Sequence, residues 1–351
     1  MSKKKFTILG TGLVALDIII NGNPDTLPIL TAGGSCGNVL TILSFLGYNT
    51  FPIARLASNE ATHRLITDIS RWGVKTDLVS ATNDGSTPII IQRMKYNEHG
   101  EVIHRFEFRD PENGKYLPSY KPVLAKAVEA ITETVNKCNL FYFDRLSRGA
   151  LELAKFYKQQ GATVFYEPSS FKEDNAHLLR DCIGIVDIVK FSHERIPNFE
   201  IKFANGFAKV EIETLGSKGA KFRSNRGKVG KWHYLPPFKL NNIKDSAGAG
   251  DWCSAGIIGH LAELEDFDID LMRIKDWADA INTGQSYAAL SCNFTGARGL
   301  MYNIELNKLK ILILKLKTEK KLDNNILKSL SKTGLMGSQK LSISELLIEN
   351  N

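Results

Sequence analysis

Hydrophobic and polar positions divide most of this chain into two kinds of segment that alternate. The first kind is a short run rich in β-branched or aromatic residues that ends at Gly, Pro or a polar residue, as in FTILG (6–10), TVFYEP (163–168), DIVKFS (187–192) and VEIETLG (210–216). The second kind is a longer, helix-like stretch, at 38–46, 61–72, 123–136, 149–160 and 251–263. Strands that alternate with helices predict an α/β protein with a mostly parallel central sheet.

Two segments depart from this alternation. LDIIINGN (16–23) is β-branched and ends at Asn-Gly, and the stretch 87–110 contains two strand-like runs around Glu98-His99-Gly100. A pair of strands around a turn of this kind predicts a hairpin. We therefore expect a small antiparallel lid, with strands at about 17–31 and 86–109.

The pattern changes again after residue 303. Ile and Leu alternate with Lys in LNKLKILILKLKTEKKL, and a tail rich in Ser, Lys and Asn follows. This favours a packed helix or strand and then a loosely ordered tail over a membrane-binding or nucleic-acid-binding segment. The expected organisation is one domain over residues 1–303 and a Lys-rich C-terminal extension over 304–351.

Composition and charge narrow the class of protein. The 351 residues are 43% hydrophobic and 24% charged, and no apolar run reaches the roughly 18 residues of a membrane span. The five cysteines are scattered without a CxxC pair, which predicts a reduced, cytoplasmic location. The stretch from 303 onward holds nine Lys and five acidic residues, so it supplies +4 of the net charge of +7. The rest of the chain has only a mild excess of positive charge, which suits an enzyme for anionic nucleotides and predicts neither a nucleic-acid nor a membrane partner.

A loop of small residues carries the clearest chemical signal. DSAGAGD (245–251) runs into the apolar stretch WCSAGIIGHLAEL. Small residues let backbone N–H groups converge, and the N-terminus of a following helix adds partial positive charge, so the loop predicts an anion site. Asp251 would stand beside a bound phosphate, where its carboxylate can accept the proton of an attacking hydroxyl. The structural alternative is an Asp that caps the helix.

This loop resembles the second signature of the ribokinase-like (PfkB) carbohydrate kinases, D-[ST]-x-G-A-G-D, and matches it at every defined position. The resemblance implies a three-layer α/β fold with a small β-sheet lid. It also implies that Asp251 is the catalytic base, that the amides of Gly248, Ala249 and Gly250 form an anion hole, and that Asp245 helps bind a monovalent cation, K⁺.

A second motif, AGGSCGN (32–38), resembles the first signature of the same family. The resemblance implies that the backbone of Gly33 and Gly34 approaches the sugar and that Asn38 contacts its hydroxyls, although Asn38 by itself could equally cap a helix. In the same family an Asp that follows the first strand binds substrate hydroxyls, and Asp17 fits that place. We also consider Arg109, after the second lid strand, as a contact for an acidic sugar.

The segment GTGLVA (10–15) mimics the G-x-G-x-x-G/A fingerprint of dinucleotide-binding dehydrogenases, which is the main competing interpretation. That fingerprint requires a helix after its second glycine. The residues that follow here, LDIIING, are β-branched and disfavour a helix. The kinase interpretation is therefore preferred.

Nucleotide and metal contacts follow from the resemblance as well. TLGSKGA (214–220) resembles the nucleotide loop T-L-G-x-x-G, which implies contacts from Thr214, Gly216 and Gly219, and Asn282 opens a helix and loop similar to those that flank adenine. No GxxxxGK[ST] loop occurs, so P-loop chemistry is excluded. Where the family has N-x-x-E for Mg²⁺ and phosphate contacts, this chain has KFSHER (190–195), in which Glu194 is the candidate.

The sequence thus predicts transfer of the γ-phosphate of ATP to a hydroxyl of a sugar or sugar-like substrate, with Mg²⁺ and K⁺ as cofactors. Two alternatives stay open. One is a nucleoside or small heterocyclic alcohol kinase of the same fold, and the other is a kinase-fold protein that binds ligands without turnover. The β-lids of this family often pair, so the resemblance also implies a homodimer.

Overall fold

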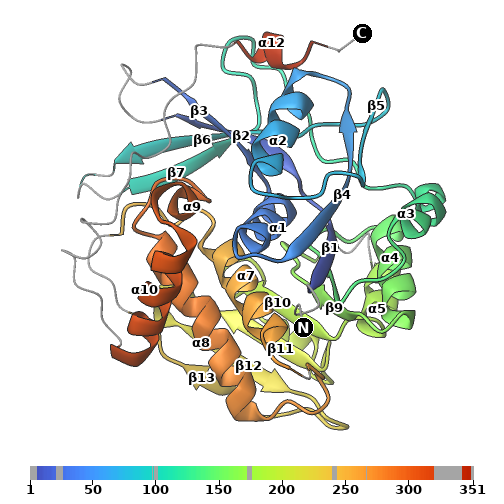
Figure 1. The fold of residues 1–351 in the computed structure, drawn as a ribbon, viewed down its shortest axis with the longest axis vertical. Helices are drawn as coiled ribbons and strands as arrows, with labels where there is room; N and C mark the ends of the chain where they lie inside the picture. The colour runs from blue at the N-terminus through green and yellow to red at the C-terminus, as the bar shows by residue number, and fades with distance from the viewer. Residues whose placement is uncertain are drawn as a thin grey trace.

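Two β-sheets organise the chain, as the computed structural model in Figure 1 shows. It describes residues 6–20, 27–96, 98, 102–171, 176–238, 243–265, 267–319 and 342–348. A nine-stranded sheet crosses the molecule, and a four-stranded sheet lies beside it.

The large sheet is mostly parallel, as predicted. Its strands run in the spatial order β13 (His233–Leu235), β12 (Ala220–Ser224), β11 (Val210–Thr214), β10 (Ile188–Ser192), β9 (Thr163–Tyr166), β8 (Leu140–Phe143), β1 (Thr7–Thr11), β4 (Asn49–Ala57) and β5 (Val79–Thr82). Every neighbouring pair from β5 to β11 is parallel. Only β12 and β13, at one edge, join antiparallel.

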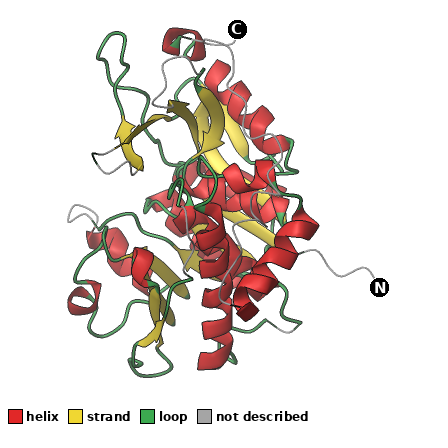
Figure 2. Ribbon diagram, turned by 90° about the vertical axis from the view of Figure 1, so that its left-hand side faces the viewer, coloured by secondary structure: helices red, strands yellow, loops and turns green. Residues whose placement is uncertain are grey.

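Helices cover both faces of this sheet, which gives three layers (Figures 1 and 2). One core contains side chains of α1 (Ser35–Phe45), α2 (Glu60–Ser70), α7 (Ala249–Ala262), α8 (Ile274–Ser291), α9 (Gly299–Asn303), α10 (Leu306–Glu319) and α12 (Ile343–Leu346). The other contains side chains of α4 (Arg148–Gln159), α5 (Ala176–Ile183) and α6 (Phe199–Lys202), with α3 (Val128–Thr134) and the 3₁₀ turn Ala125–Ala127 packed beside it. Alternate residues of each strand face opposite cores, because successive side chains of a strand point to opposite sides.

The small sheet is the predicted lid, with one difference in pairing. Its order is β3 (Ile29–Gly33), β2 (Ala15–Ile20), β6 (Ile89–Tyr96) and β7 (Val102–Glu107). β2 pairs antiparallel with β3, and β6 pairs antiparallel with β7, but β2 and β6 are parallel. The chain between β3 and β6 passes through α1, β4, α2 and β5, and so returns to the lid in the same direction as β2. Part of the predicted turn, at residues 99 and 100, lies outside the described residues.

The beginning of the C-terminal extension is a packed helix. Leu309, Leu312, Ile313 and Leu316 of α10 are buried, and α10 contacts α8. Ile343 and Leu346 of α12 join the same core, and the amide of Glu60 at the start of α2 donates to the Ile348 carbonyl. The extension thus adds side chains to the main core, and the proposed domain boundary at residue 303 stays a prediction. None of the described helices is long and apolar enough to cross a membrane.

Two helices begin earlier than the sequence predicted, and glycine explains both. α1 begins at Ser35 rather than Asn38, and α7 begins at Ala249 rather than Asp251. The preceding Gly34 and Gly248 have φ of 79° and 73°, in the left-handed region that glycine favours. A Cβ on either would lie 2.4 Å from a carbonyl oxygen. The backbone therefore turns into each helix at the glycine, and the polar residue expected at the cap enters the first turn.

Candidate active site

The candidate site lies at the carboxyl ends of the parallel strands. α1 and α7 pack against each other, and α1 follows the lid strand β3 (Figure 1). In open α/β sheets, ligands bind outside the carboxyl ends of the strands. The fold therefore brings the two glycine motifs of the sequence to one place.

Asp251 and Asn38 are in direct contact. The Asn38 side-chain amide donates from Nδ2 to Oδ2 of Asp251 at 2.8 Å, although the two residues are 213 positions apart. Asn38 lies in the first turn of α1 and does not cap it, because Gly34 holds the cap position. Likewise, Asp251 lies inside α7 and does not act as its cap. The structural alternative for each residue is therefore wrong.

The carboxyl of Asp251 has a strongly shifted pKa of about 8. Burial raises it first, since a charged carboxylate is poorly solvated there, and the nearby Glu167 carboxylate raises it further. The Asn38 hydrogen bond and the charges of Lys190 and Arg195 act in the opposite direction. A carboxyl that titrates near neutral pH is well matched to proton transfer.

Asp17 is the second buried carboxyl of the site. It lies on β2 opposite Thr31 of β3, and burial raises its pKa to about 7 against the opposing charge of Arg298. Its Oδ1 is buried, as is Oδ1 of Asn38, and neither atom has a hydrogen-bond partner among the described residues. A Cβ on Gly33 would lie 2.0 Å from Oδ2 of Asp17. The site therefore presents two buried acceptor atoms, and Gly33 leaves the space that the Asp17 carboxylate occupies.

The glycine loop before α7 is held by Asp245. Its buried carboxylate accepts hydrogen bonds from the amides of Ala247 and Gly296, each at 2.7 Å. Ala297 packs against Gly248, and its carbonyl accepts from the Trp252 indole at 3.0 Å. These contacts fix the backbone of Gly248, Ala249 and Gly250 at the N-terminus of a 14-residue helix, where its dipole favours an anion.

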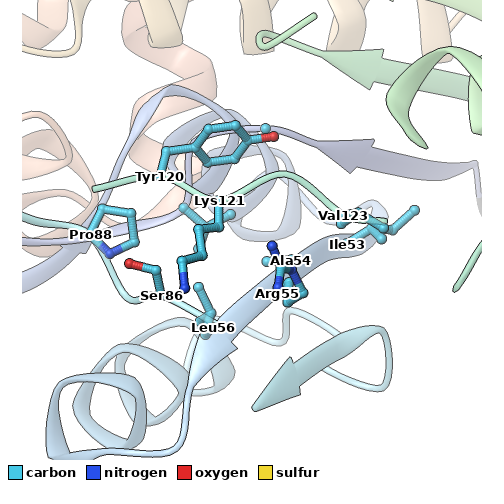
Figure 3. Close-up of a pocket in the computed structure, with 11 residues that line it drawn as sticks. Ile53, Ala54, Arg55, Leu56, Ser86, Pro88, Tyr120, Lys121 and Val123 are labelled. Carbon is cyan, nitrogen blue, oxygen red and sulfur yellow. The ribbon is translucent and has the colours of Figure 1, made fainter. Parts of the chain in front are cut away.

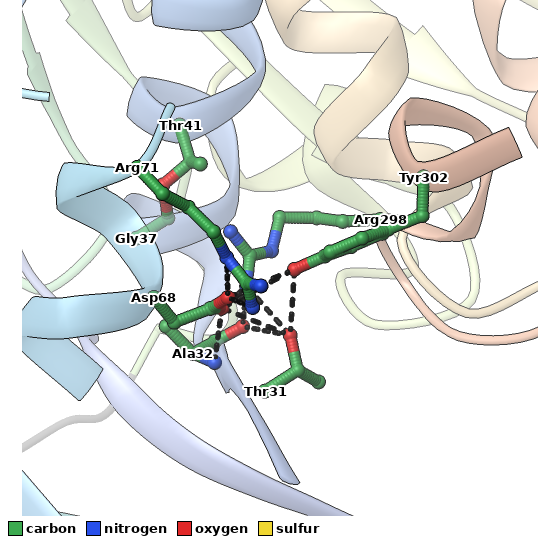
Figure 4. Close-up of polar contacts among 8 residues, drawn as sticks. All are labelled: Thr31, Ala32, Gly37, Thr41, Asp68, Arg71, Arg298 and Tyr302. Carbon is green, nitrogen blue, oxygen red and sulfur yellow. Dashed lines mark hydrogen bonds and ion pairs between the residues drawn. The ribbon is translucent and has the colours of Figure 1, made fainter. Parts of the chain in front are cut away.

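Arg298 follows in the same loop and joins it to the base of the lid. Its buried guanidinium donates from Nη2 to Thr31 Oγ1 at 2.6 Å, to the Ala32 carbonyl and to Asp68 of α2 (Figure 4). Burial raises the pKa of Asp68, but Arg298 and Arg71 outweigh it, so the pKa lies below its usual value. Gly296, Ala297 and Arg298 thus link the glycine loop before α7 to the lid. The role of Arg298 could not be predicted from the sequence, because its partners lie 230 or more positions away along the chain.

Three further functional candidates escaped the sequence analysis. Asp144 directly follows β8 and accepts from the Leu13 amide at 2.9 Å, and its Oδ1 would lie 1.6 Å from a Cβ on Gly12. Glu167, directly after β9, forms an ion pair with the buried Lys190 of β10, close to α7. A signal for Lys190 was present, since lysine is rarely buried and this one interrupts an apolar strand.

The nucleotide residues form a separate group. Thr214 ends β11 and donates from Oγ1 to the Phe191 carbonyl at 3.2 Å. Gly216 and Gly219 have positive φ at the two ends of a 3₁₀ turn, Gly216–Lys218, and a Cβ on Gly219 would lie 2.3 Å from the Leu235 carbonyl. Asn282 lies in α8, and its Oδ1 accepts from Gln285 at 3.4 Å. Their roles in nucleotide binding stay a prediction.

Among the described residues, two that the sequence predicted as ligand contacts, Glu194 and Arg109, are not bonded to Asp17 or Asp251. Glu194 is exposed after β10, and Arg109 donates from Nη1 to the Gly114 carbonyl with its guanidinium 3.7 Å from the centre of the Tyr116 ring. Within the described part of the chain, no hydrogen bond or ion pair joins either residue to Asp17 or Asp251. Arg109 is therefore engaged in a local turn, and Arg298 is the cation whose charge acts on Asp17.

A narrow pocket lies beside Gly12, between β4 and the segment around Tyr120 (Figure 3). It has a volume of about 10 Å³, which is room for a single water molecule. Asp17, Asn38 and Asp251 do not line it. It is therefore not the site of a sugar-sized ligand.

Comparisons with known proteins address the family and the fold of this chain. The family model described as pfkB family carbohydrate kinase matches residues 29–302. No curated protein sequence matches the chain. Fructokinase from Xylella fastidiosa, solved with bound ATP, has a TM-score of 0.68 at 18% identity, covering 88% of this chain and 98% of its own. Arabidopsis thaliana ribokinase, solved with ribose and ATP, has a TM-score of 0.65 at 16% identity, covering 88% and 99%. A nucleoside kinase from Methanocaldococcus jannaschii has a TM-score of 0.61 at 16% identity, covering 89% and 99%.

The fold is that of sugar and nucleoside kinases of the ribokinase family. The chain belongs to the pfkB family of carbohydrate kinases, which makes it a kinase by family and confirms the resemblance seen in the sequence.

Proposed function

We propose that this protein transfers the γ-phosphate of ATP to a hydroxyl of a small sugar or polyol, with Asp251 as the general base. The acceptor O–H bond breaks, its proton passes to the Asp251 carboxylate, and the oxygen bonds to the γ-phosphorus. The bond from that phosphorus to the bridging oxygen of ADP breaks, and ADP leaves. Asp251 then returns its proton to water.

One observation carries this proposal. The buried Oδ1 atoms of Asp17 and Asn38 lack partners among the described residues, and Asn38 is bonded to the candidate base. Buried polar atoms are almost always hydrogen-bonded, so these two acceptors suit the hydroxyl donors of a ligand. We also propose that the backbone of Gly33 and Gly34 lies beside the acceptor, with the space next to Gly33 taken by the Asp17 carboxylate. A hydroxyl that donates to Oδ1 of Asn38 would lie beside Asp251, because the amide nitrogen of the same side chain is bonded to Asp251.

The nucleotide would lie between the glycine loop and the turn that carries Thr214, Gly216 and Gly219, with Asn282 near the base. Within the described residues no cluster of three His, Cys, Asp or Glu side chains could hold a metal ion alone. This fits Mg²⁺, which is commonly held by substrate phosphates and one or two carboxylates, and Glu194 is the candidate here. Bound Mg²⁺ would neutralise charge on the phosphates. We also propose that K⁺ binds beside Asp245 and orders its loop.

The location and the oligomeric state are also proposals. The five cysteines are free thiols in the structure, which accords with the cytoplasmic location that we propose. Phe106 and Phe108, in and after β7, are exposed, which accords with a homodimer formed through the lids.

The defining experiment is an ADP-release assay of the full chain with Mg²⁺ and ATP against sugars, sugar acids and nucleosides. We expect release that depends on a sugar or polyol and is faster in K⁺ than in tetramethylammonium. A preference for nucleosides would favour the alternative acceptor. Equal rates in the two cations would contradict the K⁺ site, and no acceptor-dependent release with any compound would refute the kinase activity.

The raised pKa of Asp251 predicts the pH dependence. A general base acts as its carboxylate, so kcat/KM should rise through about pH 8 and reach a plateau above it. Well below the pKa, the rate should fall about tenfold per pH unit, because the fraction of carboxylate falls by that factor. Asp17, with a pKa of about 7, would steepen the acid side. A flat profile from pH 6 to 9, measured with one acceptor at fixed ionic strength, would contradict the assignment.

Gly33→Ala should impair acceptor binding selectively. The new Cβ would displace the Asp17 carboxylate, which is the end of a flexible side chain, so the fold should tolerate the change. Loss of a hydrogen bond to a charged group costs about 1.5–3 kcal/mol, so KM for the acceptor should rise roughly 10- to 100-fold.

Gly37→Ala is the matched control for this variant, because its Cβ would meet Val14 at an ordinary 3.6 Å. Steady-state kinetics with acceptor and ATP varied in turn measure both constants. An unchanged acceptor KM in Gly33→Ala, or an equal rise in Gly37→Ala, would argue against the pocket.

A further inference from the structure

A buried lysine and a half-buried glutamate form an ion pair beside the first turn of α7. Lys190 interrupts the apolar strand β10, and its side chain is 2% exposed. Val189 pairs with Tyr166, the last residue of β9, so Lys190 and Glu167 are the residues that follow this pair on the two chains. Ile188 and Phe165, two residues earlier, face the core that contains α7. Lys190 and Glu167 therefore point to the same side of the sheet, toward α7.

Every polar atom of this pair has a partner in the site. The Lys190 ammonium is ion-paired with Oε1 of Glu167 and donates to the Gly250 carbonyl at 3.2 Å. Oε2 of Glu167 accepts from Ser254 and, at 3.1 Å, from Tyr142. Ser254 lies one helical turn after Asp251 on α7. The pair thus contacts α7 at two points, Gly250 in the first turn and Ser254 in the second, on either side of Asp251 in the sequence.

From this geometry we propose that Lys190 and Glu167 are positioning residues, which hold the first turn of α7 and set the ionisation of Asp251 through their opposite charges. This inference rests on the proposed function, because it takes Asp251 to be the base. Neither residue needs to touch the substrate. A purely structural ion pair would stabilise the fold without moving the pH at which Asp251 ionises.

The charges around Asp251 fix the sign of each expected effect. The groups that act on it are Glu167 after β9, Lys190 of β10, Arg195 after β10 and Asn38 of α1. Tyr142 of β8 and Cys36 of α1 also lie close, and burial keeps the pKa of each above its ordinary value and the group neutral. Glu167 raises the pKa of Asp251 more than Lys190 lowers it. Removal of the glutamate charge should therefore favour the carboxylate form of Asp251.

The test compares the acid limb of the kcat/KM profile in two variants. Glu167→Gln keeps an acceptor for Lys190, and should move the limb about one pH unit lower, so that the ratio of kcat/KM at pH 6 to that at pH 9 rises about tenfold. Lys190→Met combined with Glu167→Gln also removes the positive charge, so its limb should lie between those of Glu167→Gln and the wild type.

Glu211→Gln is the matched control. Glu211 is a buried glutamate of the same sheet, paired with the buried Arg223 away from Asp251. This variant should lose stability and keep the wild-type limb. A limb that stays at the wild-type pH in Glu167→Gln would overturn the proposal, and a double variant with the same limb as Glu167→Gln would overturn the role of Lys190. If only the double variant folds, a limb at the wild-type pH overturns the proposal.

A second measurement separates this inference from the kinase activity itself. The carboxyl ¹³C shift of Asp251, assigned by its loss in Asp251→Asn, reports ionisation without turnover. We expect the midpoint of its titration to move in the same order as the kinetic limb. If the wild-type protein is inactive and the titration midpoints of the variants still move in this order, the proposed function is refuted. The effect of the two charges on Asp251 would then stand. A midpoint that is equal in all variants would refute the inference.

Discussion

Asp251→Asn should lower kcat by about 10²-fold or more, which is the usual scale for loss of a general base. The amide has the shape of the carboxylate but cannot take the proton of the acceptor hydroxyl. Its side-chain oxygen can still accept the Asn38 hydrogen bond, so the site should keep its geometry. Acceptor and ATP affinities, measured by calorimetry, should therefore change little.

Glu263→Gln is a suitable control for this variant. Glu263 follows the last turn of α7 and accepts from Tyr48 at 2.9 Å, so the change alters a carboxylate at the other end of the same helix. It should leave kcat unchanged. Wild-type turnover in Asp251→Asn would show that another group takes the proton, and Glu167 would then be the nearest candidate among the described carboxylates that act on Asp251.

Arg298→Met should lower the free energy of unfolding far more than Arg71→Met does. Arg298 and Arg71 both pair with Asp68, but the Arg298 side chain is 1% exposed and that of Arg71 is 56% exposed. Removal of one member of a buried ion pair typically costs about 3–5 kcal/mol, because the remaining charge stays buried without full compensation. An exposed pair contributes about 0–1 kcal/mol. The urea midpoint should thus fall strongly in Arg298→Met and little in the control, Arg71→Met.

The effect of pH on this difference follows from Asp68. Its pKa in the folded state is lowered, so the stability that its ion pairs contribute is present above the pKa of the unfolded chain. That contribution is lost as the pH falls through the lower folded value. The difference in urea midpoint between Arg298→Met and Arg71→Met should therefore become smaller at acid pH. Equal urea midpoints for Arg298→Met and Arg71→Met at pH 7 would contradict the assignment of Arg298 as the buried link between the glycine loop and the lid.

The sequence by itself predicted the α/β class, the mostly parallel sheet, the lid and the family. These features depend on local periodicity and on glycines whose positions exclude a side chain, such as Gly33, Gly34 and Gly248. The sequence also singled out Asp17, Asn38 and Asp251. The contact between Asn38 and Asp251 appeared only in the structure, and a common site for all three residues stays a prediction.

The tertiary structure alone decided which charged residues are buried in the site. Lys190 and Glu167 are 23 residues apart, and Asp68 and Arg298 are 230 apart. A charged side chain is stable in the interior only when another segment supplies its partner, and no local pattern of hydrophobic and polar positions records that partner. The glycine motifs could be recognised from the sequence because glycine meets a constraint of its own backbone. The environment of Asp251, in contrast, depends on strands and helices that meet only when the chain folds.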